Sequence, residues 1–269
     1  MATAATTPAS TSDVTTTTRP TLKMPISGPF SADIAEGLTT EINVPFTDNV
    51  DCSGRDCTLP LDVLAPSTAT HLPTIVLVPG GPATFDARRY LDALAGALAR
   101  RGAVVFLISY RSAATSNGHP DTMQDVWCTV RFARAVTADY GGDPERTVLV
   151  GHSLGGDLAL TAAITPEADS AGCLFDGNAV PDAVVGLAPD YAVTIPDSLD
   201  HVPPVVLASG SDDPGSTGGA DVAELLKDAG GDAVYREFAA TTHVELIDPA
   251  ITPGVVDLVF EAVKKTADA

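Results

Sequence analysis

The stretch TVLVGHSLGG at residues 147–156 predicts a buried strand that turns sharply into a helix. Its first four residues form a continuous apolar run, which is typical of a strand buried on both faces. A residue at such a turn has strained backbone angles and tolerates only small neighbours two positions before and after it, as Gly151 and Gly155 provide. We expect the turn to raise the Ser153 hydroxyl above the sheet. It also places the Leu154 N–H at a helix N-terminus, where developing negative charge is favoured.

Strand and helix patterns alternate on both sides of this stretch. Apolar runs predict buried strands at 74–78, 104–108, 147–150, 183–187, 205–207 and 233–238, and helical spacing marks 91–98, 125–138, 158–163, 222–226 and 255–263. Two earlier segments, 40–46 and 59–64, alternate with period two and form an antiparallel edge. This order predicts an α/β fold, with a mainly parallel sheet covered by helices on both faces. We expect residues 1–22, rich in Thr and Ser, to be a disordered tail or linker, and residues 23–269 to be one domain.

The charge balance excludes some classes of partner. Asp and Glu number 35 against 15 Lys and Arg, a formal net charge of -20. Nucleic acids and anionic membranes repel a chain this negative. No apolar run approaches the ~18 residues needed to cross a bilayer, so no membrane span is expected. The oligomeric state stays open.

The four cysteines indicate oxidised bridges. Cys52 and Cys57 flank a short polar loop in which a disulfide closes easily, and Cys128 and Cys173 could join a helix to a later loop. Such bridges favour an extracytoplasmic, secreted protein; four reduced thiols in a cytoplasmic enzyme are the alternative. Residues 2–21 lack the basic start and apolar core of a signal peptide, as expected for a mature secreted N-terminus or a linker. No second cluster of Cys or His completes a metal site.

A serine nucleophile requires a base, and the base requires an orienting carboxylate. Asp212 and Asp213 follow the strand at 205–207, and Asp213 is favoured over Asp212 as the acid. His243 follows the strand at 233–238, which brings it to the same edge of the sheet as Ser153. His152 is expected to pack or to line the pocket, and the remaining histidines, in predicted loops, to be solvated: His71, His119 and His201.

The turn after the strand at 74–78 supplies backbone donors. Acyl transfer needs N–H groups directed at the carbonyl oxygen as it becomes an oxyanion. In Pro79-Gly80-Gly81-Pro82 the N–H of Gly81 is the best candidate, because Pro82 has no N–H to donate. The alternative is that these residues form only a turn that precedes a helix, because Gly-Gly-Pro suits such a turn equally well.

Several motifs appear together and in order: VPGG at 78–81, SYR at 109–111, DV at 125–126, YGGDPER at 140–146, GHSLGG at 151–156, Asp213 and His243. Over residues 40–266 the chain resembles the α/β-hydrolase superfamily, in particular carboxylesterases similar to hormone-sensitive lipase, feruloyl and acetylxylan esterases, and kynurenine formamidase. The resemblance implies Ser153 as nucleophile, His243 as general base and Asp213 as acid. It implies Gly81 and Leu154 as the oxyanion hole.

The chain departs from this family at two places. Members usually have His-Gly-Gly-Gly where residues 79–82 read PGGP, so a third oxyanion donor is lost at Pro82. Only a short segment, 190–201, separates two central strands, so little or no cap is expected. An open site suits short-chain esters or esters displayed on a polymer. An amidase or peptidase, a cutinase-like polyester hydrolase and a non-catalytic binding protein are the alternatives, and the complete Ser–His–Asp set argues against the last. No cofactor or catalytic metal motif is present. Arg111 and Asp125 are expected to pair beneath the site.

Overall fold

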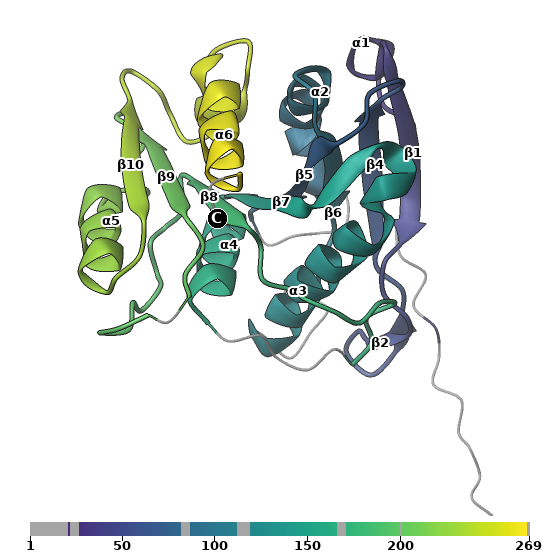
Figure 1. Cartoon of the computed structure of the whole chain (residues 1–269), viewed down its shortest axis with the longest axis horizontal. Helices are drawn as coiled ribbons and strands as arrows, with labels where there is room; N and C mark the ends of the chain where they lie inside the picture. The colour runs from purple at the N-terminus through teal and green to yellow at the C-terminus, as the bar shows by residue number, and fades with distance from the viewer. Residues whose placement is uncertain are drawn as a thin grey trace, which may run out of the picture.

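The computed structural model describes residue 21 and residues 27–81, 87–111, 119–165, 171–199 and 201–267. Apart from Thr21, which bridges to Asp56, the predicted tail at 1–22 lies outside this part of the chain, as does Pro82. Within the described residues the central sheet has eight strands in the order β1-β4-β6-β5-β7-β8-β9-β10 (Figure 1). Their bounds are β1 Leu38–Pro45, β4 Pro60–Pro66, β5 Leu72–Val78, β6 Val104–Ile108, β7 Gly142–His152, β8 Ala183–Leu187, β9 Val205–Gly210 and β10 Ala233–Phe238.

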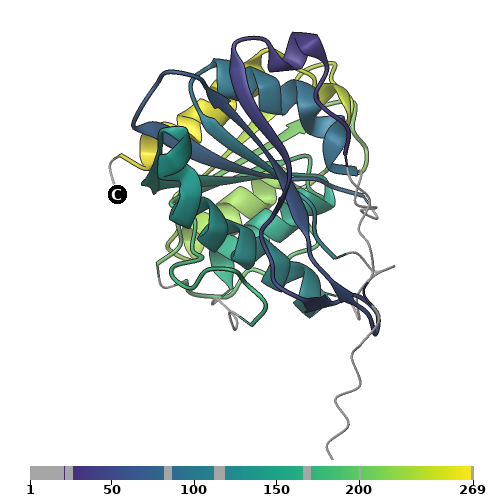
Figure 2. The ribbon, with the colours of Figure 1, turned by 90° about the vertical axis from the view of Figure 1, so that its right-hand side faces the viewer.

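Helices cover both faces of the sheet and give three layers (Figures 1 and 2). One face carries α3 (His119–Val136), α4 (Leu154–Ile164) and α5 (Gly219–Asp228), and the other carries α1 (Ala32–Ala35), α2 (Asp92–Arg100) and α6 (Gly254–Lys265). Three short 3-10 turns complete the helical segments of the described chain: η1 Ala87–Leu91, η2 Thr137–Tyr140 and η3 Glu245–Ile247.

The apolar runs form central strands because both of their faces are buried. In β5, Ile75 and Leu77 pack into the core beneath α2 and α6, whereas Val76 and Val78 pack into the core beneath α3, α4 and α5. Side chains of a strand alternate between its faces, so a run without polar interruption fits only a strand covered on both sides. The pairs β5–β6, β5–β7, β7–β8, β8–β9 and β9–β10 are parallel. The predicted α/β sheet is confirmed.

The antiparallel edge is also confirmed. Strand β1 pairs antiparallel with β4, and β4 pairs antiparallel with β6. Between β1 and β4 the chain forms a small hairpin of β2 (Val50–Asp51) and β3 (Asp56–Cys57). A disulfide joins Cys52 to Cys57 across this hairpin, and a second joins Cys128 of α3 to Cys173 in the loop after α4.

The expected pair of Arg111 and Asp125 is fully formed. The guanidinium of Arg111 donates to Oδ1 of Asp125 at 2.8 Å, and the backbone N–H of Arg111 donates to Oδ2 at 2.7 Å. Both side chains are buried, at 3% and 0% exposure. A buried carboxylate with several charge-assisted hydrogen bonds fixes the chain after β6 against α3.

Helix α3 differs from its predicted bounds. It starts at His119 instead of 125, and it ends at Val136, where η2 continues to Tyr140. The prediction of a loop at His119 was therefore wrong. Pro120 is compatible with this early start, because the first N–H groups of a helix have no acceptor within it.

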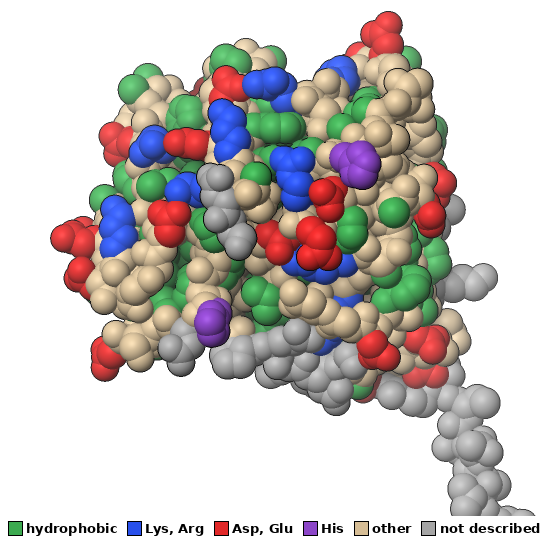
Figure 3. Space-filling model, in the orientation of Figure 1, with side chains coloured by type: hydrophobic (Ala, Val, Ile, Leu, Met, Phe, Trp, Pro, Cys, Tyr) green, Lys and Arg blue, Asp and Glu red, His purple; other side chains and the backbone are tan. Residues whose placement is uncertain are grey.

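The surface mixes charges of both signs. Acidic and basic side chains are interspersed on the face shown in Figure 3. Ion pairs of the described chain include Arg236–Glu261 (3.1 Å) and Lys265–Asp232 (2.6 Å). No helix in the described part of the chain combines the length and the apolar character needed to cross a bilayer.

Candidate active site

Ser153 lies at a strained turn between β7 and α4, as predicted. Its φ of 57° and ψ of -128° are unfavourable for a residue with a side chain. Gly151 and Gly155 make the turn possible: a Cβ on Gly151 would collide with the carbonyl oxygen of Gly155, and a Cβ on Gly155 would lie 2.6 Å from that of Pro79. The turn leaves Ser153 partly exposed at the carboxyl ends of the parallel strands.

His243 and Asp213 are joined by a short hydrogen bond, 2.6 Å between Nδ1 and Oδ2. Asp213 follows β9 and is buried, with 6% exposure, whereas Asp212 is exposed and its carboxylate accepts from the hydroxyl of Ser211. His243 follows β10, which pairs with β9, so the two loops start from neighbouring strands. Of the two carboxylates weighed from the sequence, the structure brings Asp213 to the histidine.

Ser153 and His243 line one cavity of about 310 Å³ together with Gly80, Gly81, Tyr90, His152 and Val244. The apolar side chain of Val244, which lines the cavity, is 64% exposed, and Leu154, which follows the serine in sequence, is 39% exposed. The cavity therefore presents a hydroxyl and an imidazole to one opening, with apolar surface around them.

The turn after β5 approaches the backbone of the serine turn very closely. A Cβ on Gly80 would lie 2.5 Å from the carbonyl oxygen of His152, 2.6 Å from Cβ of Ser153 and 3.3 Å from the nitrogen of Leu154. Leu154 is the first residue of α4, so its N–H is among the helix donors without an intrahelical acceptor. Gly81, with φ of 78°, follows Gly80 in this turn. Of the expected donors, Gly81 lines the same cavity as Ser153, and Leu154 follows the serine in sequence.

Tyr90 is a site residue that the sequence did not reveal. It belongs to η1, and no motif marks it. Its hydroxyl accepts from the backbone N–H of Gly80 at 2.6 Å and lies 2.9 Å from Nδ1 of His152. Although Tyr90 as a whole is 43% exposed, burial raises the pKa of its hydroxyl to about 12, which keeps it protonated.

His152 lines the cavity and packs on the proposed base, as expected. Its ring centroid lies 4.7 Å from that of His243, and its Nε2 lies 3.1 Å from the carbonyl oxygen of His243. His152 is 2% exposed. Burial, and then the neighbouring imidazole of His243, lower the pKa of His152 to about 4. The ring is therefore neutral near neutral pH.

Hydrogen bonds to α4 fix the beginning of the segment between β8 and β9. The buried carboxylate of Asp157, on α4, accepts from the backbone N–H groups of Asp190 and Ala192 at 3.1 and 3.2 Å. Burial raises the pKa of Asp157, and these backbone donors offset part of that rise. Within residues 190–199 the chain forms no helix or strand.

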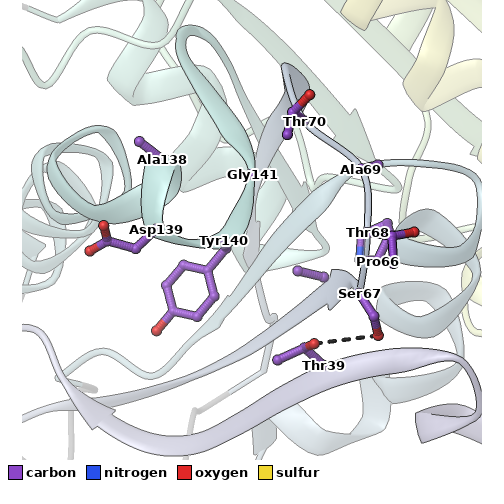
Figure 4. Close-up of a pocket in the computed structure, with 11 residues that line it drawn as sticks. Thr39, Pro66, Ser67, Thr68, Ala69, Thr70, Ala138, Asp139, Tyr140 and Gly141 are labelled. Atoms are coloured by element: carbon purple, nitrogen blue, oxygen red, sulfur yellow. Dashed lines mark hydrogen bonds between the residues drawn. The ribbon is translucent and has the colours of Figure 1, made fainter.

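A second cavity lies at the opposite edge of the sheet, where β5 and β7 begin. It measures about 390 Å³, and its lining includes Ser67, Asp139 and Tyr140 (Figure 4). The hydroxyl of Tyr140 already donates to Glu41 at 2.9 Å. None of the described residues that line this cavity is a histidine. Across the described residues, no group of three or more His, Cys, Asp or Glu side chains has an arrangement that could hold a metal ion.

Two curated relatives are similar in sequence. A probable carboxylic ester hydrolase, LipM, of Mycobacterium tuberculosis is 35% identical over 96 residues, which cover 35% of this chain and 22% of LipM. A probable isoprenylcysteine alpha-carbonyl methylesterase, ICMEL1, of Arabidopsis thaliana is 24% identical over 250 residues, which cover 75% of this chain and 52% of that protein. The chain thus spans about half or less of the length of the curated relatives it matches.

The fold and a family model complete the comparison. The structure of esterase Est22 superposes with a TM-score of 0.67 at 19% identity, covering 89% of this chain and 84% of that one. This likeness confirms the α/β-hydrolase fold that the resemblance implied. The sequence model of the BD-FAE family matches residues 61–197, which contain β5 to β8, nearly all of β4 and the serine turn. Because the matched segment makes up more than half of the chain, the chain belongs to the BD-FAE family.

Proposed function

We propose that this protein is a serine hydrolase that cleaves carboxylic esters through an acyl-enzyme on Ser153. The observation that carries the proposal is the 2.6 Å hydrogen bond from His243 to buried Asp213, with His243 and Ser153 lining one cavity. A carboxylate at Nδ1 holds the imidazole so that Nε2 is available as the base. Both curated relatives have names of ester hydrolases, which supports the same reaction.

The reaction proceeds in two halves. Oγ of Ser153 attacks the ester carbonyl carbon while His243 accepts its proton, and the N–H groups of Gly81 and Leu154 hold the oxyanion. His243 then gives the proton to the leaving alcohol oxygen as the carbon–oxygen bond breaks, which leaves the acyl-enzyme. Water repeats the sequence: His243 takes its proton, the hydroxide oxygen adds to the acyl carbon, and Ser153 leaves with the proton returned.

The substrate is either an ester with a short acyl chain or an ester that is displayed on a polymer. The cavity is small, about 310 Å³, and two apolar side chains are exposed: Val244 in its lining and Leu154 next to Ser153 in sequence. A short acyl group fits beside Ser153, while the rest of a larger substrate extends over the open rim. We also propose an extracytoplasmic location, because both disulfides together use all four cysteines and such bonds persist in oxidising compartments.

The test is labelling with a serine-directed fluorophosphonate. The wild-type protein is expected to react stoichiometrically, Ser153→Ala to remain unlabelled, and Ser198→Ala, an exposed serine in the segment after β8, to label like wild type. Hydrolysis of p-nitrophenyl esters of increasing acyl length is expected to decline with length. Matched anilides are expected to react far more slowly, and preferred hydrolysis of the anilides would indicate an amidase instead. A wild-type protein that neither labels nor hydrolyses esters would refute the proposal.

A further inference from the structure

We propose that Tyr90 and His152 are positioning residues that fix the oxyanion-hole turn and the histidine loop relative to each other; this inference rests on the ester-hydrolase function proposed above. The oxyanion-hole turn is residues 79–81 after β5, and the histidine loop is residues 239–244 after β10. Strands β5 and β10 are separated in the sheet by β7, β8 and β9. Backbone pairing within the sheet therefore does not join the two segments directly.

The direction of each hydrogen bond can be assigned, starting from the oxyanion-hole turn. The N–H of Gly80 can only donate, so the hydroxyl oxygen of Tyr90 accepts it, at 2.6 Å. The hydrogen of the Tyr90 hydroxyl is then available to Nδ1 of His152, at 2.9 Å. Nδ1 accepts and carries no proton of its own.

The second half of the connection follows from the tautomer. A neutral imidazole with an unprotonated Nδ1 has its proton on Nε2, and Nε2 lies 3.1 Å from the carbonyl oxygen of His243. A carbonyl oxygen can only accept, so the same tautomer satisfies both contacts. Burial, with the pKa of His152 lowered to about 4, keeps the ring in this neutral form. Four groups thus form one chain of donors and acceptors, in which each bond polarises the next.

This connection affects the two parts of the site that must act together. The Gly80 N–H is occupied by Tyr90, which fixes the peptide that precedes the Gly81 N–H. At the other end, His152 fixes the backbone of the residue whose imidazole is the proposed base. A displacement of about 1 Å between catalytic groups costs on the order of 100-fold in rate.

Tyr90 is itself held rigidly from the sheet. Its neighbour Arg88 is 0% exposed, and Nε of Arg88 donates to Oδ2 of Asp62, on β4, at 2.8 Å. Arg88 also donates to Oδ1 of Asn43 at 2.9 Å. A buried ion pair therefore anchors the short turn η1 to the sheet. This anchor fixes the backbone that carries the Tyr90 side chain.

The first experiment removes one hydroxyl. Tyr90→Phe is expected to lower kcat for p-nitrophenyl acetate by about 10- to 100-fold with little change in KM, because a loosened oxyanion donor costs less than its complete loss. The inhibition constant of an alkyl trifluoromethyl ketone, whose adduct on Ser153 carries an oxyanion, is expected to rise by a similar factor. Tyr140→Phe, at the far edge of the sheet, is the matched control and should retain wild-type values. Wild-type kinetics in Tyr90→Phe would overturn the proposal.

The second experiment uses a conservative rescue. His152→Gln retains a side-chain N–H donor for the His243 carbonyl, whereas His152→Phe retains the ring without any donor. We expect the Gln variant to recover a large part of the kcat that the Phe variant loses. Equal losses in the two folded variants, as judged by circular dichroism, would show that the ring shape and not the hydrogen bond matters, and would overturn the proposal.

A third readout does not depend on turnover. Nitrogen NMR of histidine-labelled protein is expected to show His152 protonated at Nε2 and unprotonated at Nδ1 at neutral pH. The Tyr90→Phe variant should change the Nδ1 resonance. If this tautomer is observed in a protein that fails to hydrolyse esters, the proposed function fails while the connection stands. If Nδ1 is protonated in an active enzyme, the connection is wrong while the function stands.

Discussion

Nδ1 of His243 lies 2.6 Å from Oδ2 of Asp213, although the two residues are 30 positions apart in the chain. The carboxylate of Asp213 also accepts from the backbone N–H of Gly215 at 3.0 Å. A carboxylate bonded from two sides has little freedom, so it holds the imidazole in one orientation. Asp212, its neighbour in sequence, is exposed and makes no such contact with His243.

The two aspartates are therefore expected to differ sharply when their charge is removed. Asp213→Asn should lower kcat for p-nitrophenyl acetate by about 10,000-fold, because the amide favours the wrong histidine tautomer. Asp212→Asn changes an exposed side chain and should leave kcat within about 2-fold of wild type. Steady-state kinetics on the two variants check this. If Asp212→Asn lost most of its kcat while Asp213→Asn stayed active, Asp212 and not Asp213 would be the carboxylate that orients His243.

Gly80 is expected to tolerate no side chain. In Gly80→Ala the new Cβ would meet the His152 carbonyl oxygen at 2.5 Å and Cβ of Ser153 at 2.6 Å. The turn must then move away from the serine, and kcat/KM should fall by about 100- to 1,000-fold, the cost of losing an oxyanion donor. Gly28→Ala is the control, because no atom lies within 4 Å of its added Cβ. Equal activities of the two variants would contradict the close approach.

The two disulfides are expected to contribute unequally to stability. Cys128 and Cys173 are separated by 45 positions, whereas Cys52 and Cys57 are separated by 5. Closing the longer loop restricts the unfolded chain more, which corresponds to about 4 kcal/mol against about 2 kcal/mol in the loop-entropy model. Urea unfolding of the two double Cys→Ser variants measures both free energies. The reverse ranking would show that native-state effects outweigh chain entropy.

The buried, neutral ring of His152 predicts a pH dependence of stability. Burial of the ring, followed by the neighbouring imidazole of His243, lowers its pKa to about 4 in the folded protein, against about 6.5 in an unfolded chain. Between these values the unfolded chain binds a proton that the folded chain does not, so stability falls as the pH falls from about 6.5 to about 4. The loss amounts to about 3 kcal/mol.

The measurement for this prediction is a difference between proteins. Urea unfolding of wild type and of His152→Gln near pH 7 and near pH 4 gives four free energies of unfolding. The decrease between the two pH values should be about 3 kcal/mol larger in wild type, because other titrating groups are common to both proteins. Equal decreases would mean that His152 titrates alike in both states.

Local patterns were sufficient for the fold and for part of the site. Apolar runs that lack polar interruption must be buried on both faces, so β5 and β6 were predictable within a residue or two, as was the buried part of β7. The serine turn was predictable because Gly151 and Gly155 meet a steric requirement that lies within five residues. The antiparallel edge followed from period-two alternation. The start of α3 was not predictable, because its first turn carries no apolar repeat.

The sequence by itself determined which strand each candidate catalytic residue follows. The serine comes after β7, the two carboxylates come after β9 and the histidine comes after β10. Only the tertiary structure decided which carboxylate reaches His243, because Asp212 and Asp213 differ in burial and direction and not in residue type. It also decided that Tyr90 and His152 connect Gly80 to His243. Those hydrogen bonds join residues that no local periodicity relates, and they exist because folding brings the ends of separate strands to one edge of the sheet.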